Sequence, residues 1–581
     1  HQLRDIGSGA GKSLRPHPAL LRLTALSRLL VYGDHADVVD GPAVLKRFIE
    51  DGADFGGLQG LSLRAAVFQV FLRLSSLLQG WADAESEAAG DIDDVSDAQD
   101  RLMEVLVDLA RAFDRAWAHP DQPAPAVDLE RLRPLVRQAP PRLTLKHPEG
   151  FAYYALYPEL YLQAARGLPN GCVVIGLRSI GVGLAALVAA VANARACVSV
   201  RPRGEPFARR LDISPALRAR ILTDPQATFV LVDEGPGLSG SSLGGAADWL
   251  EDQGVPAERI VFMPSHSGDL GPHAQPHHRA RWITAERRVA SFESVILDAP
   301  GAPLAAWFED VAGKPTRPLK DLSGGAWRRL SPWPDAPADP SREARKYRLT
   351  TERGLYLLSF VGLDATAEEK LERARALSRA AFAPEPLALR HGFLLEPWID
   401  GGAPDRRQIV EALGPYLAFR ASAFPAAHQG ASLSELAAMA RQNLREAMGQ
   451  AAPDLGAWTE RRLERLQAAS RPVHIDGRLH RWEWLHGPRG VLKTDAVDHS
   501  QSHDLIGPQD IAWDVAGAVV EFDLSAAERS ALLTETQADP DLCDFMTAAY
   551  LGFQVGWWSM AQDPSAASEV SRYVQAVRRL S

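Results

Sequence analysis

The sequence predicts a multidomain α/β protein with a helical N-terminal domain, a central parallel-sheet domain and a bilobal C-terminal domain. The chain has 581 residues, which is too long for one ordinary hydrophobic core. Its apolar pattern changes from helical to strand-like near residue 150. Two proline-rich stretches, 119–141 and 330–341, interrupt the patterned segments. These observations predict domains at 1–118, 141–310 and 341–581.

The composition limits the class of partner. Hydrophobic residues make up 46% and charged residues 23%, as in globular proteins. The net charge of −10, without a basic cluster, disfavours nucleic acid, whose binding needs patches of Lys and Arg. Apolar runs such as 183–194 are too short to span a bilayer, so no membrane partner is expected. We expect small-molecule substrates, and no pattern in the sequence specifies an oligomeric state.

Three widely spaced cysteines indicate free thiols in a reducing cytoplasm, not a disulfide framework or a metal cluster. Near the N-terminus, "GSGAGKS" (7–13) resembles a phosphate-binding loop. It lacks the required glycine, where Ile6 stands, and the buried strand that should precede it, so we expect a flexible leader. We expect His35 at a capped helix start, since no other metal ligand lies at helical spacing.

The N-terminal domain is predicted to be helical over 18–117. Apolar residues recur at spacings of three and four in "RAAVFQVFLRLSSLLQGW" (64–81). The same spacing continues in 97–117, which also places acidic residues in its first turn. The acidic segment between these two helices is expected to be a solvated loop.

The central domain is predicted to contain a parallel sheet. Short, continuous apolar runs alternate with helix-like segments, which is typical of strands buried on both faces. The five expected strands lie at 171–177, 196–202, 227–234, 259–265 and 293–299.

The third of these strands ends in two acids and a loop of small residues, "FVLVDEGPGLSGSS" (229–242). Asp233 and Glu234 stand where open parallel sheets bind ligands, beyond the carboxyl end of a strand. A helix follows the loop at once, so backbone N–H groups and the helix N-terminus face the same spot. The carboxylates suit ribose hydroxyls or a Mg²⁺ ion. We expect one phosphate to be bound by Gly237, Ser239, Gly240, Ser241 and Ser242.

This stretch resembles the signature of type I phosphoribosyltransferases, with one extra loop residue before Gly240. The resemblance implies that Asp233 and Glu234 bind the ribose hydroxyls of phosphoribosyl pyrophosphate and that 237–242 hold its 5′-phosphate. An upstream strand, loop and helix match the family's pyrophosphate loop at Arg178, Ser179 and Gly181. The guanidinium N–H groups of Arg178 would donate hydrogen bonds to the departing pyrophosphate and neutralise its charge.

The basic segment "SVRPRGEPFARRL" (199–211) resembles the mobile loop that covers the site in the same family. We select Arg203 from it as a ligand for the substrate. The other candidates in this segment are Arg201, Arg209 and Arg210.

The C-terminal domain is predicted to begin with two strands joined by a glycine-containing turn, over 345–363. A helix over 367–382 and a strand leading into a loop at 392–402 follow. From there to residue 581 the chain reads as helical, except for 471–515.

Residues 471–515 contain three short segments with acidic residues. "VHIDGRLHRWEW" (473–484) places His474 and Asp476 in a loop, a short strand ends at Asp495, and a helix begins near Asp514. Two acids on separate loops, one a base and one a metal ligand, are what phosphoryl transfer from a nucleotide needs.

This order resembles the aminoglycoside phosphotransferase (kinase-like) family, over about 341–560. By resemblance, Asp476 is the base, Asp495 binds Mg²⁺, and Glu396 lies in the nucleotide-binding interlobe hinge. His474 and Asp514 would brace the loops.

Two positions depart from that family. Its metal-binding Asn is Arg481 here, so we expect Glu483 or His480 to substitute. Ser359 stands near the place of its ATP-binding lysine, so Lys346 on the preceding strand is expected to reach the nucleotide. The expected helix partner of Lys346 is one of Glu368, Glu369 and Glu372.

Together these patterns predict a cytoplasmic bifunctional enzyme. It would transfer phosphoribosyl from phosphoribosyl pyrophosphate to a small-molecule acceptor and carry a second, ATP-dependent phosphotransferase domain, with Mg²⁺ at both sites. Nucleotide salvage or synthesis of a nucleoside-like metabolite would need such a pair. Two alternatives remain: a kinase regulated by a phosphoribosyl-pyrophosphate sensor, and a transferase with an inactive kinase-like binding module.

Overall fold

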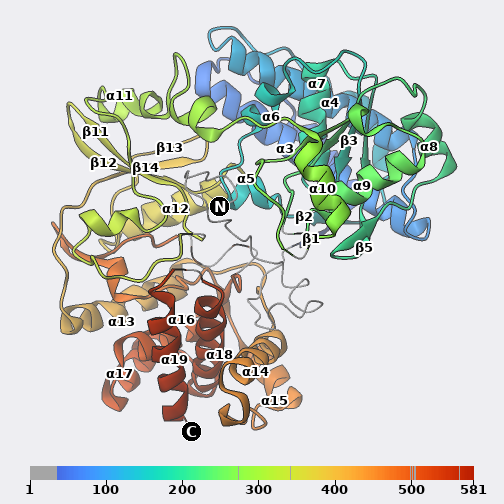
Figure 1. The fold of residues 1–581 in the computed structure, drawn as a ribbon. Coiled ribbons are helices and arrows are strands. Elements are labelled where there is room, and N and C mark those ends of the chain that lie inside the picture. The colour runs from blue at the N-terminus through green and yellow to red at the C-terminus, as the bar shows by residue number, and fades with distance from the viewer. Residues whose placement is uncertain are drawn as a thin grey trace.

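The structure, a computed structural model, describes residues 36–237, 239–272, 274–340, 342–497, 499, 502, 505–561 and 563–580. The expectations for 7–13 and for His35 lie outside these residues. Figure 1 shows an α/β unit in blue and green, a yellow antiparallel sheet beside it, and a helical body in orange and red below both.

The α/β unit is built on a five-stranded, all-parallel sheet in the order β4-β3-β7-β8-β9. Because β3 pairs with both β4 and β7, the strand order reverses between β3 and β7, and ligands bind at such a switch point. The strands are β3 (Val173–Leu177), β4 (Ala196–Val200), β7 (Phe229–Val232), β8 (Ile260–Met263) and β9 (Glu286–Arg287).

Four of the five expected strands are confirmed. The fifth is wrong: Glu293–Leu297 forms a π-helix, and the sheet edge is the two-residue strand β9. A short apolar run does not by itself distinguish a strand from a buried helical turn, because neither is long enough to show a period.

Helices cover both faces of the parallel sheet. One face, with Val174 and Val230, packs under α7 (Gly181–Ala192) and the long helices α3 (Gly60–Ala88) and α4 (Asp97–Ala118). The opposite face, with Ile175, packs under three helices. These are α8 (Pro215–Ile221), α9 (Ser241–Asp252) and α10 (Pro276–Thr284).

The helical N-terminal segment does not enclose a core of its own. The apolar stripes of α3 and α4 belong to the same core as α7 and the sheet. This differs from the free-standing helical domain expected at 1–118, because the inner faces of these helices are completed by the sheet unit. Helix α3 is long and apolar enough to cross a membrane by length and composition, and here it is a core helix.

Smaller elements complete the α/β unit. They are β1 (Ala36–Asp40), α2 (Gly41–Asp51), β2 (Arg142–Lys146), α5 (Glu149–Tyr153), α6 (Pro158–Ala165), the hairpin β5 (Arg203–Glu205) and β6 (Ala208–Arg210), and α11 (Glu309–Ala312). Short 3₁₀ segments lie at Leu129–Arg137, Ala257–Arg259, Leu304–Phe308, Ala326–Leu330, Gly449–Ala451 and Arg481–Glu483.

The antiparallel sheet has the order β10-β11-β12-β14-β13, and α12 (Thr366–Arg379) packs on one of its faces. The other face, with Tyr347, Leu358 and Phe393, joins the core of the α/β unit. The two sheets are therefore parts of one continuous packed body. The strands are β10 (Lys320–Asp321), β11 (Lys346–Thr351), β12 (Gly354–Phe360), β13 (Ala388–Arg390) and β14 (Phe393–Pro397).

The helical body has a separate core. The expected switch from strands to helices after Gly402 is confirmed, with short strands only inside 471–515. The helices are α13 (Arg406–Ala423), α14 (Leu433–Met448), α15 (Glu460–Ala469), α16 (Ala512–Phe522), α17 (Ala526–Thr536), α18 (Pro540–Ser559) and α19 (Ala566–Leu580). The strand pairs are β15 (Pro472–Val473) with β18 (Gln509–Asp510), and β16 (Trp484–Gly487) with β17 (Gly490–Lys493).

Candidate functional site

The first candidate site lies at the switch point of the parallel sheet. Asp233 and Glu234 follow β7 directly, beside the loop that follows β3. Burial raises the pKa of Asp233 to about 7. Burial, followed by the neighbouring Asp233, raises the pKa of Glu234 to about 8. Two adjacent carboxyls that ionise near neutrality are a costly arrangement unless a cation or hydroxyl donor binds there.

The loop after these acids bends toward the β5–β6 hairpin. Gly237 and Gly240 have left-handed φ angles of 63° and 58°. The hydroxyls of Ser239 and Ser241 lie 2.9 Å apart, and the Ser241 hydroxyl donates to the Pro206 carbonyl at 2.5 Å. Ser242 lies in the first turn of α9. The expected phosphate loop therefore sits at a helix N-terminus, with a hairpin against one side.

Arg178 and Arg203 lie beside this loop but point away from it. The buried Arg178 guanidinium pairs with Asp83, at 3.0 Å, and with Asp93. Arg203 donates to Ser86 at 2.6 Å and lies 3.5 Å from Asp93. The expected contact of both arginines with the substrate stays a prediction; here their guanidinium groups join α3 and the α3–α4 connection to the sheet.

Arg209 on β6 interacts electrostatically with Asp233, as Arg201 also does. Burial and then Arg201 lower its pKa, whereas Asp233 raises it. Its Nη1 donates to the Pro202 carbonyl at 3.1 Å, and none of the described carboxylates forms an ion pair with it. Sequence reasoning named Arg209 among four arginines without separating it from the others, because only the hairpin fold decides which side chains face inward.

Ser179 and Gly181 have different surroundings. Arg201 lies with its Nη2 3.4 Å from the Ser179 hydroxyl, and the Arg178–Ser179 peptide is cis. Gly181 begins α7, and its carbonyl would lie 2.2 Å from a Cβ added at Gly176. The Gly181 backbone therefore packs tightly between helix and strand, which is a structural use of a position expected to bind pyrophosphate.

The second candidate site lies between the antiparallel sheet and the helical body. Lys346 on β11 is the cross-strand partner of Ser359 on β12, so the two side chains share the sheet face away from the main core. The Lys346 ammonium pairs with Asp495. Burial opposes both charges, but the pair holds the pKa of Asp495 well below its usual value and raises that of Lys346.

Asp495 gathers two further groups. They are the carboxylate of Glu483 and the imidazole of His499. One possible metal-ligand atom from each of Asp495, Glu483 and His499 lies within 4.8 Å of the other two. His499 Nε2 is 3.5 Å from Asp495. Two carboxylates suit Mg²⁺, which prefers oxygen ligands, so the residues fit the expected metal. His499 was missed from sequence, because nothing in its spacing identifies a ligand that a loop brings back to the strand end.

Cations lie next to the same acids. Arg478 Nε is 3.2 Å from Glu483, and Lys493 Nζ is 3.7 Å from the other Glu483 oxygen. His480, the other expected substitute for the missing asparagine, instead contacts the Tyr573 hydroxyl at 3.0 Å. The structure therefore selects Glu483 over His480 as the neighbour of Asp495.

Asp476 is buried, with 1% of its surface exposed. Tyr416 donates its hydroxyl to one carboxylate oxygen, and Lys493 Nζ lies 3.4 Å from the other. Asp514 accepts from the backbone N–H groups of Asp476 and Gly477, at 2.7 and 2.9 Å. Asp514 thus braces the loop as expected, while the expected base at Asp476 does not meet solvent.

The other residues expected near the nucleotide are Glu396, the acids of α12 and His474. Glu396 lies on β14 opposite Leu357, immediately before the strand's final residue. The acids of α12 do not pair with Lys346: Glu369 lies 3.8 Å from Arg373, and Glu372 lies 2.6 Å from Arg375. Asp495 takes the place of the expected helix partner. The backbone of His474 joins the loop to neighbouring segments, donating to Phe424 and accepting from Arg420.

Comparison with known proteins gives fold likenesses only. No family model matches the chain, and no curated protein does. Among solved structures, choline kinase LicA from Streptococcus pneumoniae is 15% identical, with 40% of this chain and 89% of that chain covered and a TM-score of 0.27.

Two further kinases show a similar degree of likeness. An ethanolamine kinase from Plasmodium vivax is 11% identical, with 47% of this chain and 85% of that one covered and a TM-score of 0.30. A spectinomycin phosphotransferase in complex with ADP and spectinomycin is 12% identical, with coverages of 48% and 96% and a TM-score of 0.31. At these identities and TM-scores the likenesses carry no argument about activity.

Proposed function

We propose that residues 342–580 bind a magnesium nucleotide and transfer its terminal phosphoryl group to a hydroxyl of a small molecule. The observation that carries the proposal is the cluster of Lys346, Asp495 and Glu483 at the junction of the sheet and the helical body. In such chemistry the protein mainly positions the phosphates and neutralises their charge. Lys346 would contact the phosphates, and Asp495 and Glu483 would hold the metal.

The metal would neutralise charge on the transferred phosphoryl group. Asp495 would be a ligand of this metal, and Lys346, which now pairs with Asp495, would then be available to a phosphate oxygen. Asp476 is the proposed base, and it must leave the Tyr416 hydroxyl to reach a substrate. If this contact persists with substrate bound, the domain is a nucleotide-binding module without turnover.

Nucleotide binding and turnover are tested separately. Lys346→Met is expected to weaken ATP binding at least tenfold in the presence of Mg²⁺, measured by calorimetry. Asp476→Asn is expected to keep ATP binding and to lower phosphoryl transfer by 100-fold or more, measured as ADP formation with a panel of hydroxyl compounds. Lys314→Met, at a lysine outside the cluster, is the matched control. Unchanged ADP formation in Asp476→Asn would show that Asp476 is not the base.

A second function is supported by the parallel-sheet site. We infer that it binds phosphoribosyl pyrophosphate, with Asp233 and Glu234 at the ribose hydroxyls and the loop 237–242 at the 5′-phosphate. The support is the position of both acids at the switch point, their raised pKa values, and the electrostatic interaction of Arg209 with Asp233. Arg209, not Arg178, is then the side chain placed to neutralise a departing pyrophosphate.

The donor site is tested by pyrophosphate release from phosphoribosyl pyrophosphate in the presence of candidate bases. Asp233→Asn/Glu234→Gln is expected to lower release by at least 100-fold, and Arg209→Ala by at least tenfold. Arg279→Ala, at an arginine on α10 away from the acids, is the control. Full turnover in the double variant would exclude the transferase role. Donor binding without any release would favour a sensor that regulates the phosphotransferase.

Both functions together describe a bifunctional enzyme that uses phosphoribosyl pyrophosphate and ATP with Mg²⁺, on small-molecule substrates in the cytoplasm. Residues 149–161, which include α5 and the start of α6, contact both acids and are the candidate segment for binding the phosphoribosyl acceptor. The Tyr161 hydroxyl donates to the Asp233 carbonyl at 2.8 Å, and Gly150 approaches the Glu234 carboxylate so closely that a Cβ there would lie 2.8 Å from it.

A further inference from the structure

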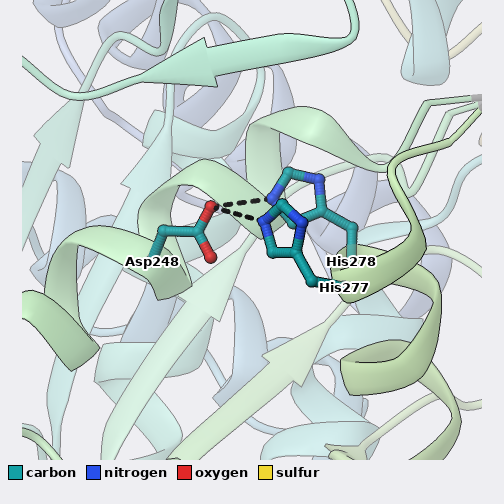
Figure 2. A group of neighbouring side chains, drawn as sticks. All are labelled: Asp248, His277 and His278. Carbon is teal, nitrogen blue, oxygen red and sulfur yellow. Dashed lines mark hydrogen bonds and ion pairs between the residues drawn. The ribbon is translucent and has the colours of Figure 1, made fainter.

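A histidine-rich cluster lies on the outer layer of the parallel sheet, outside both candidate sites. It joins Asp248 on α9 to His277 and His278 on α10. Figure 2 shows both imidazole rings directed at one oxygen of the Asp248 carboxylate. The two nearest ring nitrogens lie 3.2 Å (His277 Nε2) and 2.8 Å (His278 Nε2) from that oxygen.

These separations match those between ligands of one metal ion. Zinc–nitrogen and zinc–oxygen bonds of about 2.0–2.1 Å in tetrahedral geometry place neighbouring ligand atoms about 3.3 Å apart. All three ligand atoms of the cluster lie within 4.8 Å of one another. Two imidazoles and one carboxylate select a divalent transition metal over Mg²⁺ or Ca²⁺, which prefer oxygen donors alone.

The position of His278 is built into the packing of the two helices. Its side chain is buried, with 3% of the residue exposed. A Cβ added at Gly244 would lie 2.6 Å from the imidazole ring, so only glycine leaves room for it. The ring is therefore held in place independently of any hydrogen bond to Asp248.

The second oxygen of Asp248 is held by another group. Arg281 Nη2 donates to this Oδ1 at 2.6 Å and also reaches Glu251 at 2.5 Å. Arg281 is thus neutralised by Glu251 and fixes the carboxylate with its other oxygen toward the histidines. Such partners in the layer around a metal orient the ligands and strengthen binding.

We propose that Asp248, His277 and His278 form a binding site for a divalent transition metal such as Zn²⁺. The side chain of His277 is 53% exposed and that of Asp248 34%, which leaves one side open to water as a further ligand. The metal would lock α10 onto α9, the helix whose first turn carries Ser241 and Ser242. The site is structural, and it does not depend on either proposed activity.

Zinc content and thermal stability test the proposal on the full-length protein. We expect one Zn²⁺ per chain at this site after equilibration with Zn²⁺ and dialysis, and a higher melting temperature with the metal than after chelation. His277→Gln is the main variant, because its exposed side chain can be changed without disturbing the core. It is expected to lose this Zn²⁺ and the associated rise in melting temperature.

Two variants separate this site from the cluster at Asp495. His499→Gln is expected to keep the Zn²⁺-dependent rise in melting temperature, and His119→Gln, at an exposed histidine, is expected to behave as the parent protein. Cobalt substitution adds a direct signature, since histidine-bound Co²⁺ gives a visible spectrum that His277→Gln would lack. Equal Zn²⁺ content and equal stabilisation in His277→Gln and the parent protein would overturn the proposal.

Discussion

At the residue scale, the two acids after β7 are the clearest case of a local cost in stability at a candidate ligand-binding position. Asp233 and Glu234 are held where their ionised forms lose solvation, and the charge of Asp233 further disfavours ionisation of Glu234. The free energy of folding is therefore less favourable with both groups charged. Residues that act on a ligand commonly reduce stability in this way.

The sign of the pH dependence follows from these raised pKa values. The native protein keeps protons that the unfolded chain has lost, so this contribution to stability falls as pH rises from the ordinary carboxyl values of 3.8 and 4.5, and the loss is complete above the folded values of about 7 and 8. Asp233→Asn/Glu234→Gln is expected to be more stable than the parent protein at pH 9, by about 1–3 kcal/mol, and similar to it near pH 4. Urea unfolding at both pH values measures this difference.

An exposed acid provides the control for that experiment. Asp121→Asn is expected to change the unfolding free energy little at either pH, because the residue is exposed in a loop. A double variant that is less stable than the parent protein at pH 9 would contradict the inferred desolvation of the two carboxyls.

Sequence patterns selected Asp233, Glu234 and Asp495 because each lies at the end of a recognisable apolar strand, whereas Glu483 was named only as a substitute for the asparagine of the kinase-like family. They did not reveal that Asp83 and Asp93 would occupy Arg178. Those contacts join residues about 90 positions apart, so they depend on how α3 and α4 dock on the sheet. A residue's role cannot be predicted from local sequence patterns when it depends on how distant helices pack on the sheet.

At the element scale, the contact between α9 and the β5–β6 hairpin shapes the phosphate loop. A Cβ added at Gly245 in α9 would lie 2.1 Å from the Arg209 carbonyl oxygen. The hairpin therefore lies directly on the helix backbone, and it carries both Arg209 and the Pro206 carbonyl that accepts from Ser241.

Gly245→Ala tests this contact. Alanine in a helix interior is ordinarily stabilising by up to about 1 kcal/mol relative to glycine. Here the clash with backbone is expected to reverse the sign and to cost about 1–3 kcal/mol, while also weakening binding of phosphoribosyl pyrophosphate. Thermal unfolding and calorimetric titration measure the two effects.

Gly402→Ala is the matched control, because a Cβ at that position would meet nothing within 4 Å. It is expected to leave stability and donor binding near those of the parent protein. A stabilised Gly245→Ala with normal donor binding would argue against the close packing of hairpin and helix.

Long periodic helices and the strands β3, β4, β7 and β8 were predictable, since each has a clear apolar pattern. The two-residue strand β9 was not, because its residues Glu286 and Arg287 carry no apolar signal. The edge strand forms because the backbone of β8 offers unpaired hydrogen-bonding groups, whatever the side chains.

At the scale of the whole molecule, a buried ionic cluster joins the α/β unit to the antiparallel sheet. Glu159 on α6 is fully buried and accepts from His391 Nε2 at 2.8 Å. Arg64 Nε on α3 lies 3.3 Å from the same oxygen. Tyr157 adds a hydrogen bond to the His391 carbonyl at 2.7 Å. These contacts lie where apolar residues from both sheets share a core.

Glu159→Ala is expected to destabilise the protein by about 3–5 kcal/mol, because it leaves the buried Arg64 guanidinium and the His391 ring N–H without their acceptor. Thermal unfolding measures the loss. Asp114→Ala, which removes an exposed ion pair with Arg166, is the control and is expected to have little effect. Equal effects of the two substitutions would contradict a joining role for Glu159.

The shared core also limits which parts can move during a catalytic cycle. Because the antiparallel sheet shares a core with the α/β unit while the helical body has its own core, any movement that opens the junction at Asp495 is expected to displace the helices that follow β14. Paired spin labels on α4 and β12 should keep one separation whether or not nucleotide is present, whereas labels on β12 and α19 should report a change. Nucleotide binding at the second candidate site would thus move the last third of the chain and leave the candidate site at Asp233 and Glu234 unchanged.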